Sequence, residues 1–311
     1  MNYTDAEANA PAIMTLYAEG HSTRAIGAML GHGKSTVNAV IVRHGGEIRR
    51  QVGVDHPDYF DQISTPEQAY WLGFLSADGC MIATEKHPEG SHLSVRLAAR
   101  DKGHLVKLKA ALGAHASVLD GISNGFGKPA ASANLNVGSR RLTDALIALG
   151  INPRKSATVE PWDGPAGLMP HFWRGLFDGD GSLAIKGPGL WTAFLCGSEP
   201  CVLGFLAWAH EICGTNATPY FKTGCWYVRI SGKYQVPKLV RAMYGDATVS
   251  LDRKQERADA ILAADGPRKK PGPTSRFASE EEKREHMRKQ GREKQRRYME
   301  RKRQAAAEAL A

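Results

Sequence analysis

The chain has 311 residues, five of them cysteine, and a formal net charge of +9. This length allows two or three compact units with a substantial core. The cysteines form no Cys-x-x-Cys pair, which excludes a zinc knuckle, and their odd number argues against a disulfide framework. Since no leader and no apolar segment of roughly 18 residues is present, we expect a soluble cytoplasmic protein without membrane contact.

The positive charge is concentrated near the C-terminus. Residues 268–311 hold 15 Lys and Arg against 7 Glu, a balance of +8, and hardly any core-forming residues. Strong local positive charge attracts phosphate backbones without sequence preference. We expect residues 266–311 to form a basic tail, helical or disordered, that either contacts nucleic acid or only keeps the protein in solution.

Three short helices are expected within residues 11–44. Ser22 and Ser35 stand at N-cap positions before apolar-periodic segments, and a glycine-bearing turn lies between these segments. Two helices joined in this way are typical of the helix-turn-helix, whose second helix enters a DNA major groove. We assign residues 1–45 to this domain, with a plain three-helix bundle as the alternative. The candidate DNA-contacting side chains, all expected to be exposed on the third helix, are Lys34, Thr36, Asn38 and Arg43.

A change of composition marks the start of the central body. Residues 46–64 are rich in Gly, Pro and charged residues, which indicates a linker. Thr65, Pro66 and Gln68 then have the spacing of a capping box with proline at the first helical position. A helix is therefore expected to begin here.

Two apolar segments that each end in an acid dominate the rest of the chain. They are Tyr-Trp-Leu-Gly-Phe-Leu-Ser-Ala-Asp-Gly at residues 70–79 and Phe-Trp-Arg-Gly-Leu-Phe-Asp-Gly-Asp-Gly-Ser at residues 172–182. In both predicted helices a glycine is followed four residues later by a small residue, which leaves one face bare enough for another backbone to approach. These pairs are Gly73 with Ala77 and Gly175 with Gly179. Each helix is expected to stop at Asp-Gly with the glycine at positive φ.

The elements after each of these helices follow the same order. In the first half, strands are expected over 92–100, 116–122 and 131–137, with helices over 102–112 and 141–149. In the second half, strands are expected over 182–186, 191–196, 217–222 and 226–231, with helices over 200–213, 236–244 and 251–262. Three markers keep their spacing, since Asp78 and Asp180 differ by 102 positions, Gly113 and Gly214 by 101, and Lys155 and Lys254 by 99. We therefore predict a duplicated domain, with repeats at 65–160 and 161–265.

With this element order around them, residues 71–79 and 173–181 resemble the nine-residue motif of the LAGLIDADG homing endonucleases. The resemblance covers residues 66–262. It implies an α+β fold of tandem pseudo-symmetric αββαββα repeats with two saddle-shaped antiparallel sheets, the motif helices packed between them, behind the N-terminal all-α helix-turn-helix. It also implies that the last acid of each motif, here Asp78 and Asp180, binds magnesium at a scissile phosphate. The first motif departs from the second in having Ser76 where the second has Asp178.

The chemistry agrees with these residue types. Two carboxylates held side by side repel unless a cation lies between them, and a divalent cation with hard oxygen ligands, Mg²⁺ or Mn²⁺, is the usual solution. Such an ion activates water and neutralises charge during phosphodiester hydrolysis. Lys155 and Lys254 follow the two halves at equivalent places and could stabilise the developing negative charge, although each could also be an ordinary exposed lysine. Asp-Gly is also common in tight turns, so either acid alone would more often be structural.

The predicted function is that of a monomeric, site-specific double-strand DNA endonuclease with no obligate protein partner. The resemblance implies a mobile-element enzyme of a phage or an intron. Two alternatives remain open: a DNA-binding regulator that kept the fold and lost cleavage, and an RNA-splicing maturase. The side chains expected to face DNA from the two sheets are His92, Ser94, Arg96, Arg100, Asn134, Asn136, Lys186, Lys222, Tyr227 and Arg229.

Overall fold

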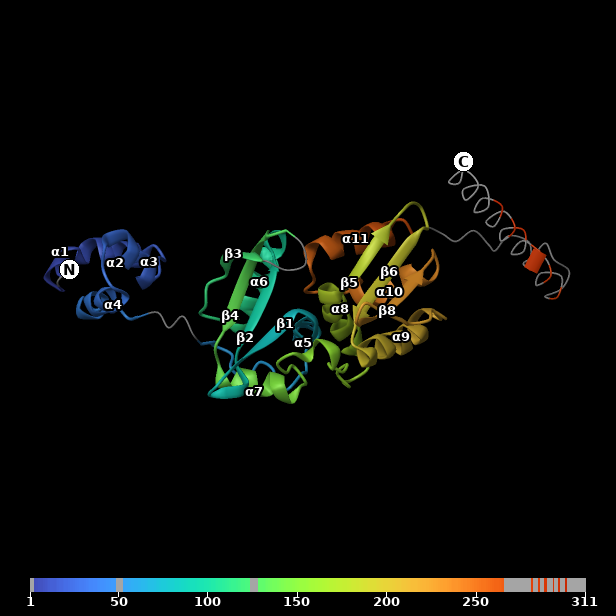
Figure 1. Ribbon diagram of the computed structural model, residues 1–311, viewed down its shortest axis with the longest axis horizontal. Coiled ribbons are helices and arrows are strands. Elements are labelled where there is room, and N and C mark those ends of the chain that lie inside the picture. The colour runs from blue at the N-terminus through green and yellow to red at the C-terminus, as the bar shows by residue number, and fades with distance from the viewer. Residues whose placement is uncertain are drawn as a thin grey trace, which may run out of the picture. The chain divides into compact units, whose positions relative to one another are not determined.

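The computed structural model describes residues 3–48, 53–123 and 128–265, together with seven separate positions between 281 and 300. It has the expected α+β fold, with two four-stranded antiparallel sheets whose strand orders are β1-β2-β4-β3 and β5-β6-β8-β7. Figure 1 shows helices α5 and α8 side by side between these sheets. The predicted fold class is confirmed, while the basic tail at 266–311 lies outside the described residues apart from those seven positions.

The three helices expected within residues 11–44 are present, and a further short helix precedes them. In chain order they are α1 (Tyr3–Ala8), α2 (Ala10–Ala18), α3 (Thr23–Leu30) and α4 (Lys34–Arg43). Ser22 caps α3 as expected, because its side chain accepts a hydrogen bond from the Ala25 amide at 3.1 Å. The expected cap at Ser35 is wrong: the N-cap is Gly33, in extended conformation, so α4 begins at Lys34, two residues earlier than expected. These helices pack on a small core of their own that includes Ile13, Ile26, Val37, Val40 and Ile41.

The first repeat begins at the predicted capping box. The Thr65 side chain accepts from the Gln68 amide, and the Gln68 side chain accepts from the Thr65 amide at 3.1 Å. The elements of this repeat are α5 (Pro66–Asp78), β1 (Gly79–Thr84), β2 (His87–Ala98), η1 (Ala99–Asp101), α6 (Lys102–Leu112), β3 (Leu119–Ser123), β4 (Ala130–Val137), α7 (Arg140–Ala148) and η2 (Lys155–Ala157).

The second repeat has the same order of helices and strands. Its elements are α8 (Met169–Asp180), β5 (Gly181–Ile185), β6 (Trp191–Gly197), α9 (Glu199–Cys213), β7 (Tyr220–Lys222), β8 (Cys225–Ser231), α10 (Gln235–Tyr244) and α11 (Asp252–Ala263). The strand expected over 217–222 is shorter, since pairing with β8 begins only at Tyr220.

The segment expected to be a linker differs from that expectation in its second half. Val54 forms an isolated β-bridge with Ala114, and the Asp55 amide donates to the Gly113 carbonyl at 3.0 Å. Phe60 is 1% exposed and belongs to the main core. Val54, Tyr59 and Ile63 pack against the same core, so residues 53–64 belong to the first repeat rather than to a linker.

Helices α5 and α8 approach each other along their glycine-bearing faces. A Cβ atom on Gly73 would overlap the Phe172 carbonyl, and one on Gly175 would overlap the Tyr70 carbonyl. One on Gly179 would overlap the side chain of Ala77. Backbones can come this close only where side chains are missing, so the small residues fix how the two helices pack.

The glycines that end α5 and α8 do not have the expected positive φ. Gly79 has φ −72° and Gly181 has φ −100°, because each helix passes directly into a strand. Glycine is needed there for space. A Cβ on Gly79 would lie 2.6 Å from the Leu75 carbonyl oxygen, and one on Gly181 would lie 2.5 Å from the Phe177 ring.

The two sheets bury one face each. In the first sheet Leu93, Val95 and Leu135 are buried in the core, and in the second Leu195 and Val228 take the corresponding places. The alternating residues of the same strands point to the opposite face of each sheet. We call these opposite faces open face 1 and open face 2.

Candidate functional site

The last residues of α5 and α8 bring two carboxylates together. Asp78 and Asp180 are both half-buried, and a Cβ placed on Gly179 would lie 3.3 Å from Asp78 Oδ2, so the Asp78 carboxylate lies against the end of α8. Burial, followed by repulsion from Asp180, raises the pKa of Asp78 to about 7. Burial also raises the pKa of Asp180. A carboxyl pair of this kind is unstable in its fully ionised form without a cation.

Lys155 and Lys254 lie at equivalent places beside this pair, and both are buried, so the alternative of an exposed lysine is wrong for each. The Lys155 ammonium donates to the Ala77 carbonyl at 3.2 Å. The Lys254 ammonium donates to the Phe177 and Asp178 carbonyls at 2.6 Å each. Each lysine thus places a positive charge on carbonyl groups at the C-terminal end of its own motif helix, where the helix dipole is negative.

The two lysines also act on the carboxylates across the repeats. Burial lowers the pKa of Lys254 to about 8 and lowers that of Lys155, while the neighbouring acids oppose these shifts. Among the charges that lower the pKa of Asp78, Lys254 is the strongest, and among those that lower the pKa of Asp180, Lys155 is the strongest. The acid of one repeat is therefore stabilised mainly by the lysine of the other.

Asp178 has a structural environment. It is 1% exposed and accepts hydrogen bonds from the Tyr70 hydroxyl at 2.8 Å, the Tyr244 hydroxyl at 2.6 Å and the Leu251 amide at 2.7 Å. Leu251 is the N-cap of α11, the helix that carries Lys254. Asp178 thus joins both motif helices to the start of α11. The corresponding Ser76 only donates to the Leu72 carbonyl of its own helix, at 2.9 Å.

The carboxylate pair fits a hard divalent cation. Both side chains offer oxygen ligands, and their mutual repulsion would be relieved by positive charge between them. Within the described ranges no group of three or more His, Cys, Asp and Glu side chains could hold a metal. The remaining ligands of an ion at Asp78 and Asp180 would therefore come from backbone carbonyls, water or a bound phosphate.

The residues expected to face DNA from the first sheet lie together on open face 1, with one exception. Ser94 pairs with Asn136, and Arg96 pairs with Asn134, at positions that alternate with the buried leucines and valine. His92 continues this row on β2, opposite Ile82 of β1. Arg100 lies outside the strand, in η1, because β2 ends at Ala98.

Open face 2 holds most of the residues expected from the second sheet. Tyr227 and Arg229 lie on β8 and Lys222 lies on β7, whereas Lys186 follows the end of β5. Three aromatic or sulfur-bearing neighbours on this face were not predicted from the sequence, namely Phe194, Cys196 and Tyr220. For Phe194 and Cys196 the available signal was their alternation with buried residues in a predicted strand, whereas Tyr220 lies in a strand that is exposed throughout.

The four residues expected to contact DNA from the N-terminal domain all lie on α4. Lys34 and Arg43 are exposed, but Thr36 and Asn38 are only half-exposed. Asn38 lies directly beside the buried Val37, which explains its partial burial. The exposed charge on this helix is therefore at its two ends.

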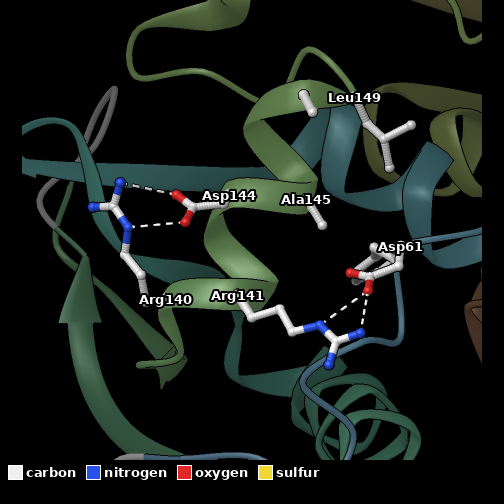
Figure 2. Close-up of a pocket in the computed structure, with 8 residues that line it drawn as sticks. Asp61, Arg140, Arg141, Asp144, Ala145 and Leu149 are labelled. Carbon is white, nitrogen blue, oxygen red and sulfur yellow. Dashed lines mark hydrogen bonds and ion pairs between the residues drawn. The ribbon is translucent and has the colours of Figure 1, made fainter.

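A separate hollow of about 710 Å³ lies beside α7. Figure 2 shows that its two arginines are paired with acids, Arg140 with Asp144 at 3.0 Å and Arg141 with Asp61 at 2.9 Å. None of the sequence-predicted site residues lines it. We therefore do not place the functional site there.

No protein-family model and no curated protein matches the chain. Solved structures that resemble it include full-length DUF199/WhiA from Thermatoga maritima, with a TM-score of 0.43, 15% identity and coverage of 69% of this chain and 66% of that chain. The homing endonuclease I-WcaI bound to its DNA recognition sequence has a TM-score of 0.46 and 11% identity, with 64% and 90% covered. The LAGLIDADG homing endonuclease I-GzeII in complex with its DNA target has a TM-score of 0.45 and 10% identity, with 65% and 90% covered.

The chain thus spans slightly less than two thirds of the WhiA chain. At such low identities these likenesses concern the backbone alone, and function has to be inferred from the side chains of this protein. In the described ranges no helix has the length and apolar character needed to cross a membrane.

Proposed function

We propose that the chain is a metal-dependent endonuclease acting on double-stranded DNA. The observation that carries this proposal is the pair Asp78 and Asp180 at the adjoining ends of α5 and α8, with the buried Lys155 and Lys254 beside it. Structural acids are normally paired with a cation or fully hydrogen-bonded, as Asp178 is. Burial raises the pKa of Asp178 as well, but at Asp78 the repulsion from a second carboxyl adds to this shift, and such a carboxyl pair is typical of a functional site.

Asp78 and Asp180 would hold one or more Mg²⁺ or Mn²⁺ ions. When bound, such an ion makes water a stronger nucleophile and neutralises charge on the phosphate. Both carboxylates would have to be ionised to hold such an ion at the ends of the two motif helices, and the raised pKa means that Asp78 ionises only as the pH rises through about 7. The buried lysines keep positive charge at these helix ends, where the phosphate would become more negative.

DNA binding would come from the two open faces and from α4. Antiparallel strands fit a major groove, and open face 1 presents amide, hydroxyl, imidazole and guanidinium groups that match the edges of base pairs. Lys34 and Arg43 on α4 would bind phosphates. Because one chain supplies both acids, a monomer suffices. The role of a mobile-element enzyme belongs to the same proposal.

The test is cleavage of a library of double-stranded DNA sites, with Mg²⁺ and separately with a chelator. We expect a metal-dependent double-strand cut at a small set of sites, abolished by Asp180→Asn while DNA binding persists. The exposed Asp163→Asn, in the segment between the two repeats and outside both motif helices, is the matched control and should cut normally. Tight binding without a metal-dependent cut at any bound site would contradict the nuclease proposal and leave the regulator alternative.

A further inference from the structure

Open face 2 carries a row of aromatic side chains that crosses three strands. The Phe194 ring on β6 stacks on Tyr227 of β8, with centroids 5.4 Å apart and an interplanar angle of 27°. Tyr227 stacks on Tyr220 of β7, with centroids 5.5 Å apart and an angle of 22°. Tyr220 is 40% exposed and lies on the edge strand, so the row ends at the solvent. We call these three residues the aromatic row.

The corresponding places on open face 1 have no such row. The strand registers place Phe194 opposite Arg229 and Ser94 opposite Asn136, which makes Phe194 the counterpart of Ser94. By the same registers Tyr227 corresponds to Asn134, and Tyr220 to Leu119. The Ser94 hydroxyl donates to Asn134 Oδ1 at 3.2 Å, so a polar pair replaces an aromatic one. The two repeats have the same arrangement of strands but carry different side chains on their open faces.

This difference decides which part of a nucleic acid each face can bind. In a duplex, bases offer only their edges to a groove, and these edges are matched by amides, hydroxyls and guanidinium groups. The flat faces of bases become available only where strands are unpaired, and aromatic side chains bind them by stacking. We propose that the aromatic row binds unpaired bases of a single-stranded stretch of DNA. This inference rests on the nucleic-acid binding proposed above, but not on cleavage.

Charge on the same face supports this ligand. The Arg229 guanidinium lies 5.8 Å from the centre of the Phe194 ring, and Arg229 and Lys222 are both exposed. Cations beside stacking rings bind the phosphates between successive bases. An apolar partner would leave these charges without a counterpart, which favours a nucleic acid.

The aromatic row also lies next to the candidate catalytic pair. Two residues after Phe194, the Cys196 thiol donates to the Asp180 carbonyl at 3.2 Å. A DNA strand whose phosphate lies at Asp180 would therefore have its neighbouring bases beside β6. Unpaired bases at the aromatic row would then lie close to a phosphate held at Asp180.

The experiment measures binding of the full chain to a mixed-sequence single strand of about 15 nucleotides, the size that one such surface covers. The same sequence is tested as a duplex and as RNA, and a 2-aminopurine base in the single strand reports stacking by its quenched fluorescence. Tyr220→Leu and Tyr227→Leu keep apolar volume but remove the stacking ring. Tyr234→Leu changes a tyrosine that is 48% exposed but outside both sheets, and serves as the control.

We expect each row variant to weaken single-strand binding about 5- to 150-fold and to restore the 2-aminopurine fluorescence, and to weaken duplex binding by a smaller factor. The weakening should be the same at low and high salt, because the substitutions remove no group that binds a phosphate.

Unchanged single-strand binding in both variants, at native thermal stability, would overturn the inference while leaving the endonuclease proposal intact. Tighter binding of the RNA would overturn the assignment to DNA. If the full chain binds none of the three nucleic acids, the proposed function itself is contradicted.

Discussion

Burial and the neighbouring Asp180 disfavour ionisation of the Asp78 carboxyl group in the folded protein. Its pKa of about 7 lies well above the ordinary 3.8, so between these values the folded protein retains a proton that the unfolded chain has lost. Folding stability contributed by this group is therefore lost as the pH rises from about 4 to about 7. The ionised Asp78 carboxylate therefore does not stabilise the folded protein.

Replacing this carboxyl should stabilise the protein. We expect Asp78→Asn to raise the free energy of unfolding by about 2 kcal/mol at pH 8 in the presence of a chelator, since the amide removes an unfavourable charge. Chemical denaturation at pH 8 measures this change. The same variant should lose cleavage, and a drop in stability would contradict the raised pKa.

Metal binding should follow the ionisation of Asp78. A divalent cation binds the carboxylate form, so its apparent affinity should fall about tenfold for each pH unit below about 7 and level off above it. Titration of cleavage with Mg²⁺ between pH 6 and pH 8 measures this dependence. An affinity that does not change across this range would show that Asp78 is already ionised or is not a ligand.

Asp178 should behave in the opposite way from Asp78. Asp178→Asn leaves two tyrosine hydroxyls and the Leu251 amide competing for one weaker acceptor, and we expect a loss of about 3 kcal/mol of unfolding free energy. Ser76→Ala, at the matching position, removes one local hydrogen bond and should cost about 1 kcal/mol or less. Equal losses for the two variants in urea denaturation would contradict the structural role of Asp178.

At the scale of elements, the approach of α5 to α8 depends on two glycines with no room for a side chain. We expect Gly175→Ala to destabilise the protein by about 3 kcal/mol, because the new methyl group overlaps the Tyr70 carbonyl. Gly103 is the matched control, since it is an exposed glycine inside α6 with no atom near its missing Cβ. Gly103→Ala should raise stability by about 0.5–1 kcal/mol. Thermal unfolding of both variants tests the difference in sign.

The sequence predicted those elements whose signals are local. Periodicity and the spacing of Asp78 and Asp180 were enough to predict both repeats, and the Gly73 and Gly175 faces were enough to predict the close helix pair. The burial of Lys155 and Lys254 was not predictable, because their carbonyl partners are about 80 positions away in sequence. Long-range partners of this kind leave no periodic signal in the chain.

Two smaller differences between prediction and structure, at Phe60 and at Gly79, also arise from structure that the local sequence does not show. The packing of Phe60 on the first repeat comes from a tertiary contact inside a segment whose composition suggests a linker. The extended conformation of Gly79 follows from the strand that begins there, since β1 starts without an intervening turn. Local propensity describes the helix end correctly but does not show what comes next.

At the scale of the whole molecule, the basic segment can be tested by deletion. Removal of residues 268–311 takes away 15 Lys and Arg. If these side chains bind phosphates, DNA binding should weaken, and the slope of log affinity against log salt should fall by about one unit for each phosphate that the shortened chain no longer binds. Fluorescence anisotropy at several salt concentrations measures this slope. Equal affinity and equal slope would support the alternative of a solubilising tail.

Open faces 1 and 2 carry different side chains, so the two halves of the molecule are not equivalent. Its backbone is nearly two-fold, but Phe194 and Tyr227 would face one half of a bound DNA site while Ser94 and Asn134 would face the other. A DNA site turned end for end would meet the wrong chemistry on both sides, so only one orientation binds well. We therefore expect a non-palindromic target in which Asp78 and Asp180 always serve the same respective strands.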